Sequence, residues 1–383
     1  NTSPGFAELG LTFSVPRIAR VLLDDDDSDT TPPVAHTVLV FGGGYDPDYD
    51  AGAVPASGVV GNALFMVDAE TGALLWKATQ GATGTATTNG GVTIWQDPGL
   101  TDPIASTVTT LDTDGDGYLD RIYVGDVGGQ LWRADVGSVD SSDWKALPIA
   151  NLGRHASANT DGTDDRRFFH RPDVVRAGRG EDAFYAVVIG SGDRADPLDT
   201  ATDNKLFVIK DSGALNPNPS PITTTELADF SANDCSDGSC ASLLDPTFSQ
   251  RGWSITLGGT DSDRVGEKIL SSPTTIAGTT LVTSYIPPSA SNSCRPAVGS
   301  GRLYAVNLLT AEPALPAFAV DGEPGRFDNG VNYGRGTPMI AGGIPAGVTY
   351  VAPHQFLASD YSVTQVQHRL LWRTYWRDRS ADY

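Results

Sequence analysis

Residues Asp112–Asp135, DTDGDGYLDRIYVGDVGGQLWRAD, contain the two patterns from which the fold of this chain is inferred. The second half begins with an apolar segment (RIYV, 121–124), passes through a turn rich in Gly and Asp, and continues as a second apolar segment (QLWRADV, 130–136). Short runs of β-branched and aromatic residues around such turns are typical of β-strands. The stretch therefore predicts two strands joined by a tight turn, with an acidic loop before them.

This strand–turn–strand unit recurs, with copies that start about 60 to 95 residues apart. The expected strands are 37–41, 62–67 and 73–77, then 121–124 and 130–136, 183–189 and 205–210, and 279–285 and 302–307, with a weaker copy from Met339 through 348–351. Repeated four-stranded sheets arranged radially form a β-propeller, which protects strand edges by repetition. We therefore expect an all-β propeller with long inter-strand insertions; a pair of β-sandwiches is the alternative.

The segment Asp68–Trp76 (DAETGALLW) has the form of the blade-docking motif of quinoprotein propellers. In that motif the Asp-x-x-Thr-Gly part caps a tight bend, and the Trp packs over a turn of the neighbouring blade. The motif favours a quinoprotein-like propeller and brings in the rival hypothesis of a quinone-dependent dehydrogenase. Many of those enzymes carry adjacent cysteines, and this sequence has none. We therefore expect no enzyme activity and no catalytic residues.

The composition fits an all-β protein with many turns. The chain has 383 residues with 43 Gly and 25 Pro, and its 47 acidic residues are mostly Asp. Aspartate favours turns, whereas glutamate favours helices. The net charge of -21 argues against nucleic acid or an anionic membrane as the main partner. No apolar run approaches the roughly 20 residues that a membrane helix needs.

The acidic loop has the residue types and spacing of a calcium site. Its carboxylates stand at relative positions 1, 3, 5 and 9, with Gly117 at position 6 for a sharp turn. The expected ligands are Asp112, Asp114, Asp116, the backbone carbonyl of Tyr118, and Asp120. Position 12 is Tyr123 rather than the glutamate of an EF-hand, and the flanks 104–111 and 121–125 read as strands. We therefore expect Ca2+ at a strand-to-strand turn; a solvated acidic turn without an ion is the alternative.

Two further acidic stretches and three cysteines offer weaker hypotheses. Asp24–Asp27 with Asp29, and Asp46–Asp50, are exposed-type loops that contain clustered carboxylates. Cys235 and Cys240 flank a short polar loop, where a disulfide would indicate an oxidising compartment. Cys294 could replace either partner, and three reduced thiols are the remaining option.

We expect one propeller domain over residues 1–383. Its first part, 1–36, is expected to be an irregular acidic segment with a short strand at 10–15. Residues 365–383 are expected to provide a closing strand and a tail.

The chain resembles the C-terminal propeller domain of the PilY1/PilC family of type IV pilus biogenesis and tip-adhesin proteins. The residues that carry the resemblance are 112–135, VFGGGY (40–45), PDVV (172–175), GSGDRADP (190–197), GRLYAV (301–306) and LWR (371–373). The resemblance implies a modified seven-bladed propeller that is exported to the cell surface, the pilus tip or the outer membrane. It also implies calcium bound by the five ligands given above.

The leading hypothesis is a non-enzymatic, calcium-binding domain that regulates pilus extension against retraction, and with it twitching motility and surface attachment. Minor pilins or the pilus tip complex are the implied partners. The second hypothesis is a direct adhesin with a purely structural calcium site. Its insertions at 137–170 and 211–252 would bind a host or abiotic surface.

Overall fold

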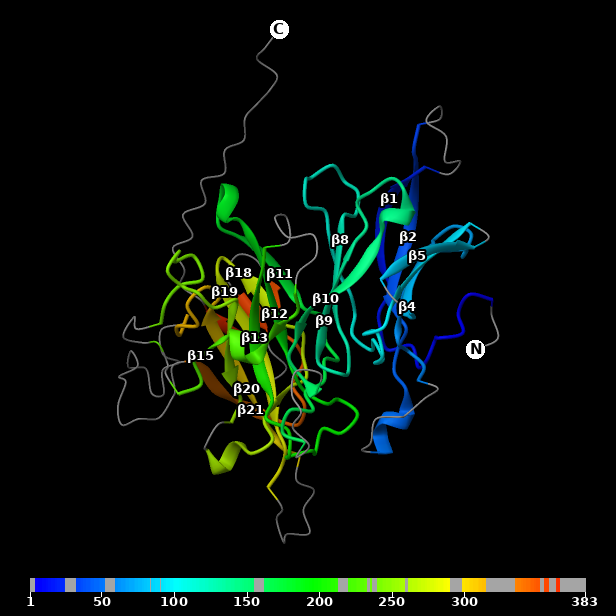
Figure 1. Ribbon diagram of the computed structural model, residues 1–383. Coiled ribbons are helices and arrows are strands. Elements are labelled where there is room, and N and C mark those ends of the chain that lie inside the picture. Colours follow the sequence, from blue (N-terminus) through cyan, green and yellow to red (C-terminus); the bar gives the residue numbers. More distant parts are fainter. Residues whose placement is uncertain are drawn as a thin grey trace.

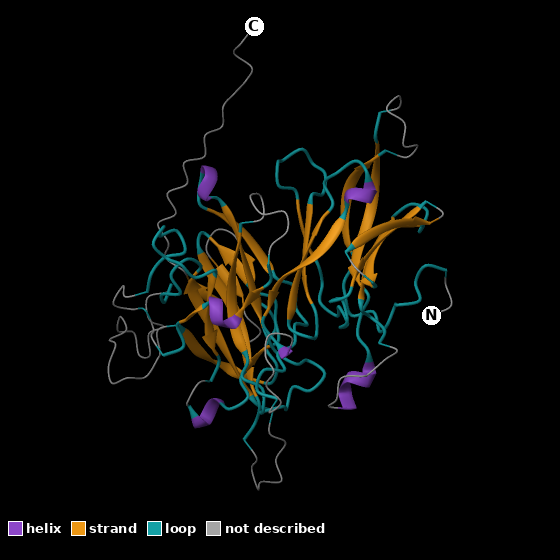
Figure 2. Ribbon diagram, in the orientation of Figure 1, coloured by secondary structure: helices purple, strands orange, loops and turns teal. Residues whose placement is uncertain are grey.

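The chain folds almost entirely into β-strands joined by loops (Figure 2). The computed structural model describes residues 4–24, 32–51, 59–82, 84–89, 91–154, 162–212, 220–232, 235, 240–258, 261–289, 298–314, 335–351, 355–357 and 363–365. Helical structure among these residues is limited to short 3-10 turns, namely η1 (Pro47–Ala51), η2 (Ser141–Asp143), η4 (Gly180–Asp182), η5 (Thr224–Glu226) and η6 (Ser262–Arg264). The expected all-β class is confirmed.

The described strands form five sheets, the first four of which follow one another across the molecule from the blue strands to the yellow ones (Figure 1). The first contains β1 (Arg17–Leu23), β2 (Val34–Gly42), β3 (Ala63–Asp68), β4 (Leu74–Gln80), β6 (Val92–Asp97) and β5 (Thr85–Asn89), in that order. The second contains β14 (Ile222–Thr223), β10 (Lys145–Asn151), β9 (Gln130–Asp135), β8 (Arg121–Gly125) and β7 (Thr109–Leu111). The third contains β11 (Asp173–Ala177), β12 (Phe184–Gly190), β13 (Lys205–Asp211), β16 (Gly252–Thr256) and β15 (Ala228–Asp229).

The fourth sheet has the order β17 (Lys268–Ile269), β19 (Thr279–Ile286), β20 (Ser300–Asn307) and β21 (Gly336–Gly342), with β18 (Thr274–Ile276) also paired to β19. The fifth contains β22 (Thr349–Val351), β23 (Gln355–Leu357) and β24 (Val363–Gln365). Each of the first four sheets is built around three neighbouring antiparallel strands: β2–β3–β4, β8–β9–β10, β12–β13–β16 and β19–β20–β21. The repeating strand units expected from the sequence fall on these strands.

Successive sheets pack face to face, so most central strands are covered on both sides. In β12, Ala186 and Val188 belong to a core shared with the fourth sheet, whereas Val187 and Ile189 belong to a core shared with the second. Side chains alternate between the two faces of a strand, so both sets have to be apolar. This explains why β12 is a continuous apolar run rather than an alternating one. Stacking of this kind is the packing of propeller blades.

Glycine is the last residue of β2, β8 and β12, because the next sheet approaches the backbone closely at each of these positions. A Cβ atom at Gly42, Gly125 or Gly190 would lie only 2.4 to 2.6 Å from atoms of the next sheet or of the segment that leads into it. Such distances are too short for any side chain, so these positions require glycine. The recurring Gly turn of the sequence is therefore a packing requirement between neighbouring sheets.

The docking motif behaves as its sequence predicts. Asp68 Oδ1 accepts hydrogen bonds from the N–H and the hydroxyl of Thr71, both at 2.7 Å, and Gly72 has a positive φ of 73° at the bend. Trp76 is fully buried, and its ring centroid lies 6.2 Å from that of Trp144, which precedes β10 of the second sheet. The motif therefore joins the first two sheets.

Two expectations about segment structure are wrong. The N-terminal segment 1–36 contains β1, and residues 10–15 form only an isolated bridge at Leu11 rather than a strand. The expected insertion 137–170 contains β10, the third strand of the second sheet. β10 includes Pro148 at a break in the register, which weakens the strand pattern in its sequence.

Other expectations are confirmed only over part of their range. Of the strand expected at 104–111, the structure forms β7 at its end. The closing strand and tail at 365–383 lie outside the described residues, except for the last residue of β24. Five sheets occur within the described residues, so the number of seven blades stays a prediction.

Candidate metal centre

The acidic loop connects β7 and β8 at the edge of the second sheet. Leu111 pairs with Arg121 across the two strands, and the Asp120 N–H donates to the Leu111 carbonyl at 3.1 Å, which closes the base of the loop. Gly115 and Gly117 have positive φ angles of 85° and 90°, which glycine adopts at low steric cost. The strand-to-strand turn expected from the sequence is therefore confirmed.

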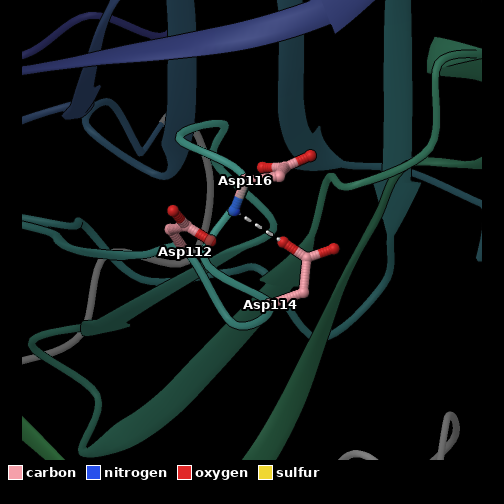
Figure 3. A group of neighbouring side chains, drawn as sticks. All are labelled: Asp112, Asp114 and Asp116. Carbon is pink, nitrogen blue, oxygen red and sulfur yellow. Dashed lines mark hydrogen bonds between the residues drawn. The ribbon is translucent and has the colours of Figure 1, made fainter. Parts of the chain in front are cut away.

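Three carboxylates of this loop converge on one exposed point (Figure 3). Each of Asp112, Asp114 and Asp116 offers an oxygen that lies within 4.8 Å of the other two. Backbone amides hold these side chains in place. Asp112 accepts from Gly115 N–H at 2.6 Å and from Gly117 N–H at 2.9 Å, and Asp114 accepts from Asp116 N–H at 3.1 Å. The cluster could therefore hold a metal ion.

The other two expected ligands have different surroundings. Asp120 is turned toward Thr113 and accepts from its N–H and its hydroxyl, both at 2.6 Å, so it is not one of the three grouped carboxylates. The Tyr118 N–H donates to Asp116 at 2.8 Å. Among the described residues, the Tyr118 carbonyl accepts no backbone hydrogen bond. The roles of Tyr118 and Asp120 as ligands stay predictions.

The electrostatics of the cluster favour a cation. All three carboxylates are exposed, and the salt bridges found in the described part of the chain involve other acidic residues. The amides of Gly115 and Gly117 lower the pKa of Asp112 because they stabilise its charged form. Negative charges at this separation repel one another, so a cation among them would stabilise the loop.

The loop is also attached to the first sheet, which sequence reasoning missed. The Leu119 N–H donates to the Arg20 carbonyl in β1 at 2.7 Å, and the Arg20 guanidinium lies 5.1 Å from the centre of the Tyr118 ring. A cation over an aromatic ring is attracted to it. No local pattern indicates this contact, because Arg20 is distant from the loop in sequence. The loop therefore spans the junction between two sheets.

The stretch Asp46–Asp50 does not form a second cluster. Asp46 accepts from Asp48 N–H and from Val60 N–H, each at 3.0 Å, and Asp50 accepts from the Tyr45 hydroxyl at 2.6 Å. These carboxylates therefore serve the turn. Within the described residues, the only group of three or more possible metal-ligating side chains is the one at Asp112.

The remaining sequence hypotheses are resolved in part. A disulfide joins Cys235 to Cys240, which is the pairing across the short polar loop. Cys294 and most of the acidic stretch 24–29 lie outside the described residues. None of the helical segments in the described ranges is long and apolar enough to cross a membrane.

Comparison with known proteins relates the chain to pilus proteins. No protein-family model matches it. A curated relative, the type IV pilus biogenesis factor PilY1 homolog of Xylella fastidiosa, is 24% identical over 261 residues, which are 65% of this chain and 17% of that protein. The chain thus spans well under two thirds of the length of this relative. The resemblance to PilY1 inferred from the sequence is confirmed.

The fold is also similar to that of a solved pilus protein. The Pseudomonas aeruginosa PilY1 C-terminal domain aligns with a TM-score of 0.60 and 18% identity, covering 94% of this chain and 72% of that one. The quinohemoprotein alcohol dehydrogenase ADHIIG of Pseudomonas putida HK5 aligns with a TM-score of only 0.33 and 14% identity, over 80% of this chain and 38% of that one. The chain therefore has the propeller fold of the PilY1 C-terminal domain.

Proposed function

We propose that this chain is a calcium-binding, non-enzymatic propeller domain of a type IV pilus biogenesis protein. In this role it regulates pilus extension against retraction, and with it twitching motility and surface attachment. The relationship to PilY1 supports the pilus assignment. The observation that carries the calcium assignment is the convergence of three exposed carboxylates on a turn between two strands.

The donor set fits calcium better than other common metals. Calcium takes six to eight oxygen ligands in flexible geometry, whereas zinc is usually bound through nitrogen or sulfur. The loop offers only oxygen donors, and its exposure leaves room for water. Asp112, Asp114 and Asp116 would hold the ion, with the Tyr118 carbonyl and Asp120 as the further expected ligands. A bound Ca2+ supplies the positive charge that the clustered carboxylates lack.

The contacts with β1 connect the metal loop to the rest of the domain. Arg20 contacts the loop at Leu119 and Tyr118, so a change in loop order reaches the junction of the first two sheets. A partner seated on this junction, such as a minor pilin or another pilus tip component, would detect whether the loop is ordered. The domain would act outside the cytoplasm, at the cell surface or pilus tip, which agrees with its disulfide.

Calorimetric titration of the calcium-depleted protein tests the metal assignment. We expect one saturable Ca2+ site, which Asp114→Asn and Asp116→Asn each abolish or weaken strongly. Asp140→Asn is the matched control, because Asp140 is an exposed turn carboxylate outside the cluster. Retention of full affinity in both cluster variants would place the ion elsewhere.

Piliation and twitching assays then test regulation. Cells that carry Asp116→Asn in the full-length protein should show altered surface piliation or twitching, whereas Asp140→Asn cells should match the wild type. Normal behaviour in a variant that no longer binds Ca2+ would reduce the site to a structural role. That outcome would favour a direct adhesin.

A further inference from the structure

A pocket of about 510 Å³ lies between β1, β7 and the segment that leads into β11. Its lining residues are Pro16, Arg17, Ile18, Thr109, Thr110 and Arg171. Small-molecule sites commonly have volumes of roughly 300–1,000 Å³, so this pocket is large enough for a small ligand. It lies apart from the metal loop, although both involve the β1–β7 region.

The charge of this pocket is unusual for so acidic a protein. Both of its ionisable lining residues, Arg17 and Arg171, are arginines, and each is half-buried. No ion pair or hydrogen bond of either guanidinium is found in the described part of the chain, whereas Arg166 and Arg167 are paired with aspartates. In a chain with 47 acidic residues, two half-buried arginines that form no salt bridge within the described residues require an explanation.

The two arginines also affect each other unfavourably. Burial lowers the pKa of Arg171, and the positive charge of Arg17 lowers it further. The acidic group that partly offsets these effects is Asp173, at the start of β11. Its carboxylate accepts a hydrogen bond from the Thr275 N–H at 2.6 Å. The pocket therefore keeps two like charges together, an arrangement that favours binding over stability.

We propose that this pocket binds a small ligand that carries an oxyanion, either a carboxylate or a phosphate. The planar guanidinium groups of Arg17 and Arg171 match both kinds of oxyanion through paired N–H donors. The hydroxyl of Thr110 can add a further hydrogen bond to the ligand. Ile18, which is 73% exposed, and Pro16 offer apolar contact to the rest of the ligand.

The pocket walls are held by the fold rather than by the ligand. Thr109 pairs with Tyr123 in the second sheet, and its hydroxyl donates to the Pro172 carbonyl beside Arg171. Arg17 pairs with Val40 in the first sheet. The site is therefore assembled from the edge strands of the first two sheets and the segment that leads into the third, and an occupant would connect them.

Isothermal titration of the whole chain at low ionic strength tests this proposal, with succinate and inorganic phosphate as separate probes. Calcium-free buffer keeps the metal loop out of the measurement. We expect one equivalent of at least one anion to bind, and Arg17→Gln or Arg171→Gln to lower its affinity about tenfold or more, since each removes a charged hydrogen bond. The preferred probe identifies the ligand as a carboxylate or a phosphate.

Two controls separate the site from general electrostatics. Arg176→Gln removes the same charge from an exposed position on β11 and should leave anion binding unchanged. Without anion, Arg17→Gln and Arg171→Gln should melt at or above the wild-type temperature, because the repulsion between the two charges is gone. The proposal is overturned if neither anion binds the wild type, or if binding survives in both pocket variants.

Discussion

Neutralising one carboxylate of the metal loop should affect the protein in opposite directions with and without calcium. Asp116→Asn keeps an oxygen that can accept the hydrogen bond from the Tyr118 N–H, which is 2.8 Å long in the wild type, so the loop retains its turn. The change removes one of three charges whose oxygens lie within 4.8 Å of one another. In chelator, the variant should therefore melt at the same temperature as the wild type or slightly higher.

With calcium the order should reverse. A ligand at one hundred times its Kd stabilises the folded state by about 2.7 kcal/mol. The unfolding entropy of a 383-residue chain is about 0.8 kcal/mol/K, which converts this stabilisation to a rise of about 3 °C. The wild type should show this rise and Asp116→Asn should not.

Differential scanning calorimetry of both proteins, in chelator and at a calcium concentration set from the titrated Kd, measures the crossover. Asp140→Asn should behave as the wild type in both buffers. An equal loss of melting temperature in chelator and in calcium would refute the reasoning, because it would show that Asp116 acts through the turn and not through an ion.

Substitutions at three further positions test the fold. Asp211→Ala should destabilise the protein by about 3 kcal/mol in urea unfolding, because fully buried Arg133 loses one of its carboxylate partners, with Asp135 remaining, and the Tyr123 hydroxyl loses its acceptor. A cost below about 1 kcal/mol, which is typical of surface ion pairs, would contradict this. Trp76→Ala should cost about 3–5 kcal/mol. Trp76→Phe should cost less, since the buried indole N–H has no hydrogen-bond partner among the residues that the structure describes; equal losses in the two variants would contradict this reasoning. Burial, with a smaller contribution from Arg194, lowers the pKa of His170 to about 4 from 6.5. As the pH falls, the unfolded chain therefore takes up this proton before the folded protein does. The contribution of His170 to the free energy of unfolding is complete above about pH 6.5 and is lost toward pH 4, so His170→Gln should remove up to about 3 kcal/mol of that decline. An unchanged dependence of stability on pH in the variant would contradict this prediction.

The sequence predicted those parts of the fold whose signals are local. Strands such as β3 and β12 are short apolar runs beside Gly and Asp turns, and the structure confirms them. The positions of β1 and β10 were missed for different reasons. Only Val21 and Leu23 of β1 are buried, so its pattern is weak, and β10 contains a proline.

The candidate site could likewise be predicted only where its signals are local. Asp112, Asp114 and Asp116 are grouped because their spacing within one turn brings them together. The orientation of Asp120 depends on Thr113, whose hydroxyl competes for the same carboxylate. The contact of Arg20 depends on the packing of one sheet against the next, which no short motif records.

The hydrogen bonds of the loop also bear on its chemical ageing. Asp114–Gly115 and Asp116–Gly117 are Asp–Gly sequences, in which the glycine nitrogen can lose its proton and attack the preceding side-chain carboxyl, expelling water and forming a cyclic imide. Both glycine N–H groups donate to Asp112, and an amide proton engaged in this way is lost less readily, which disfavours the attack. The carboxylate that begins the cluster thereby disfavours isomerisation of the other two.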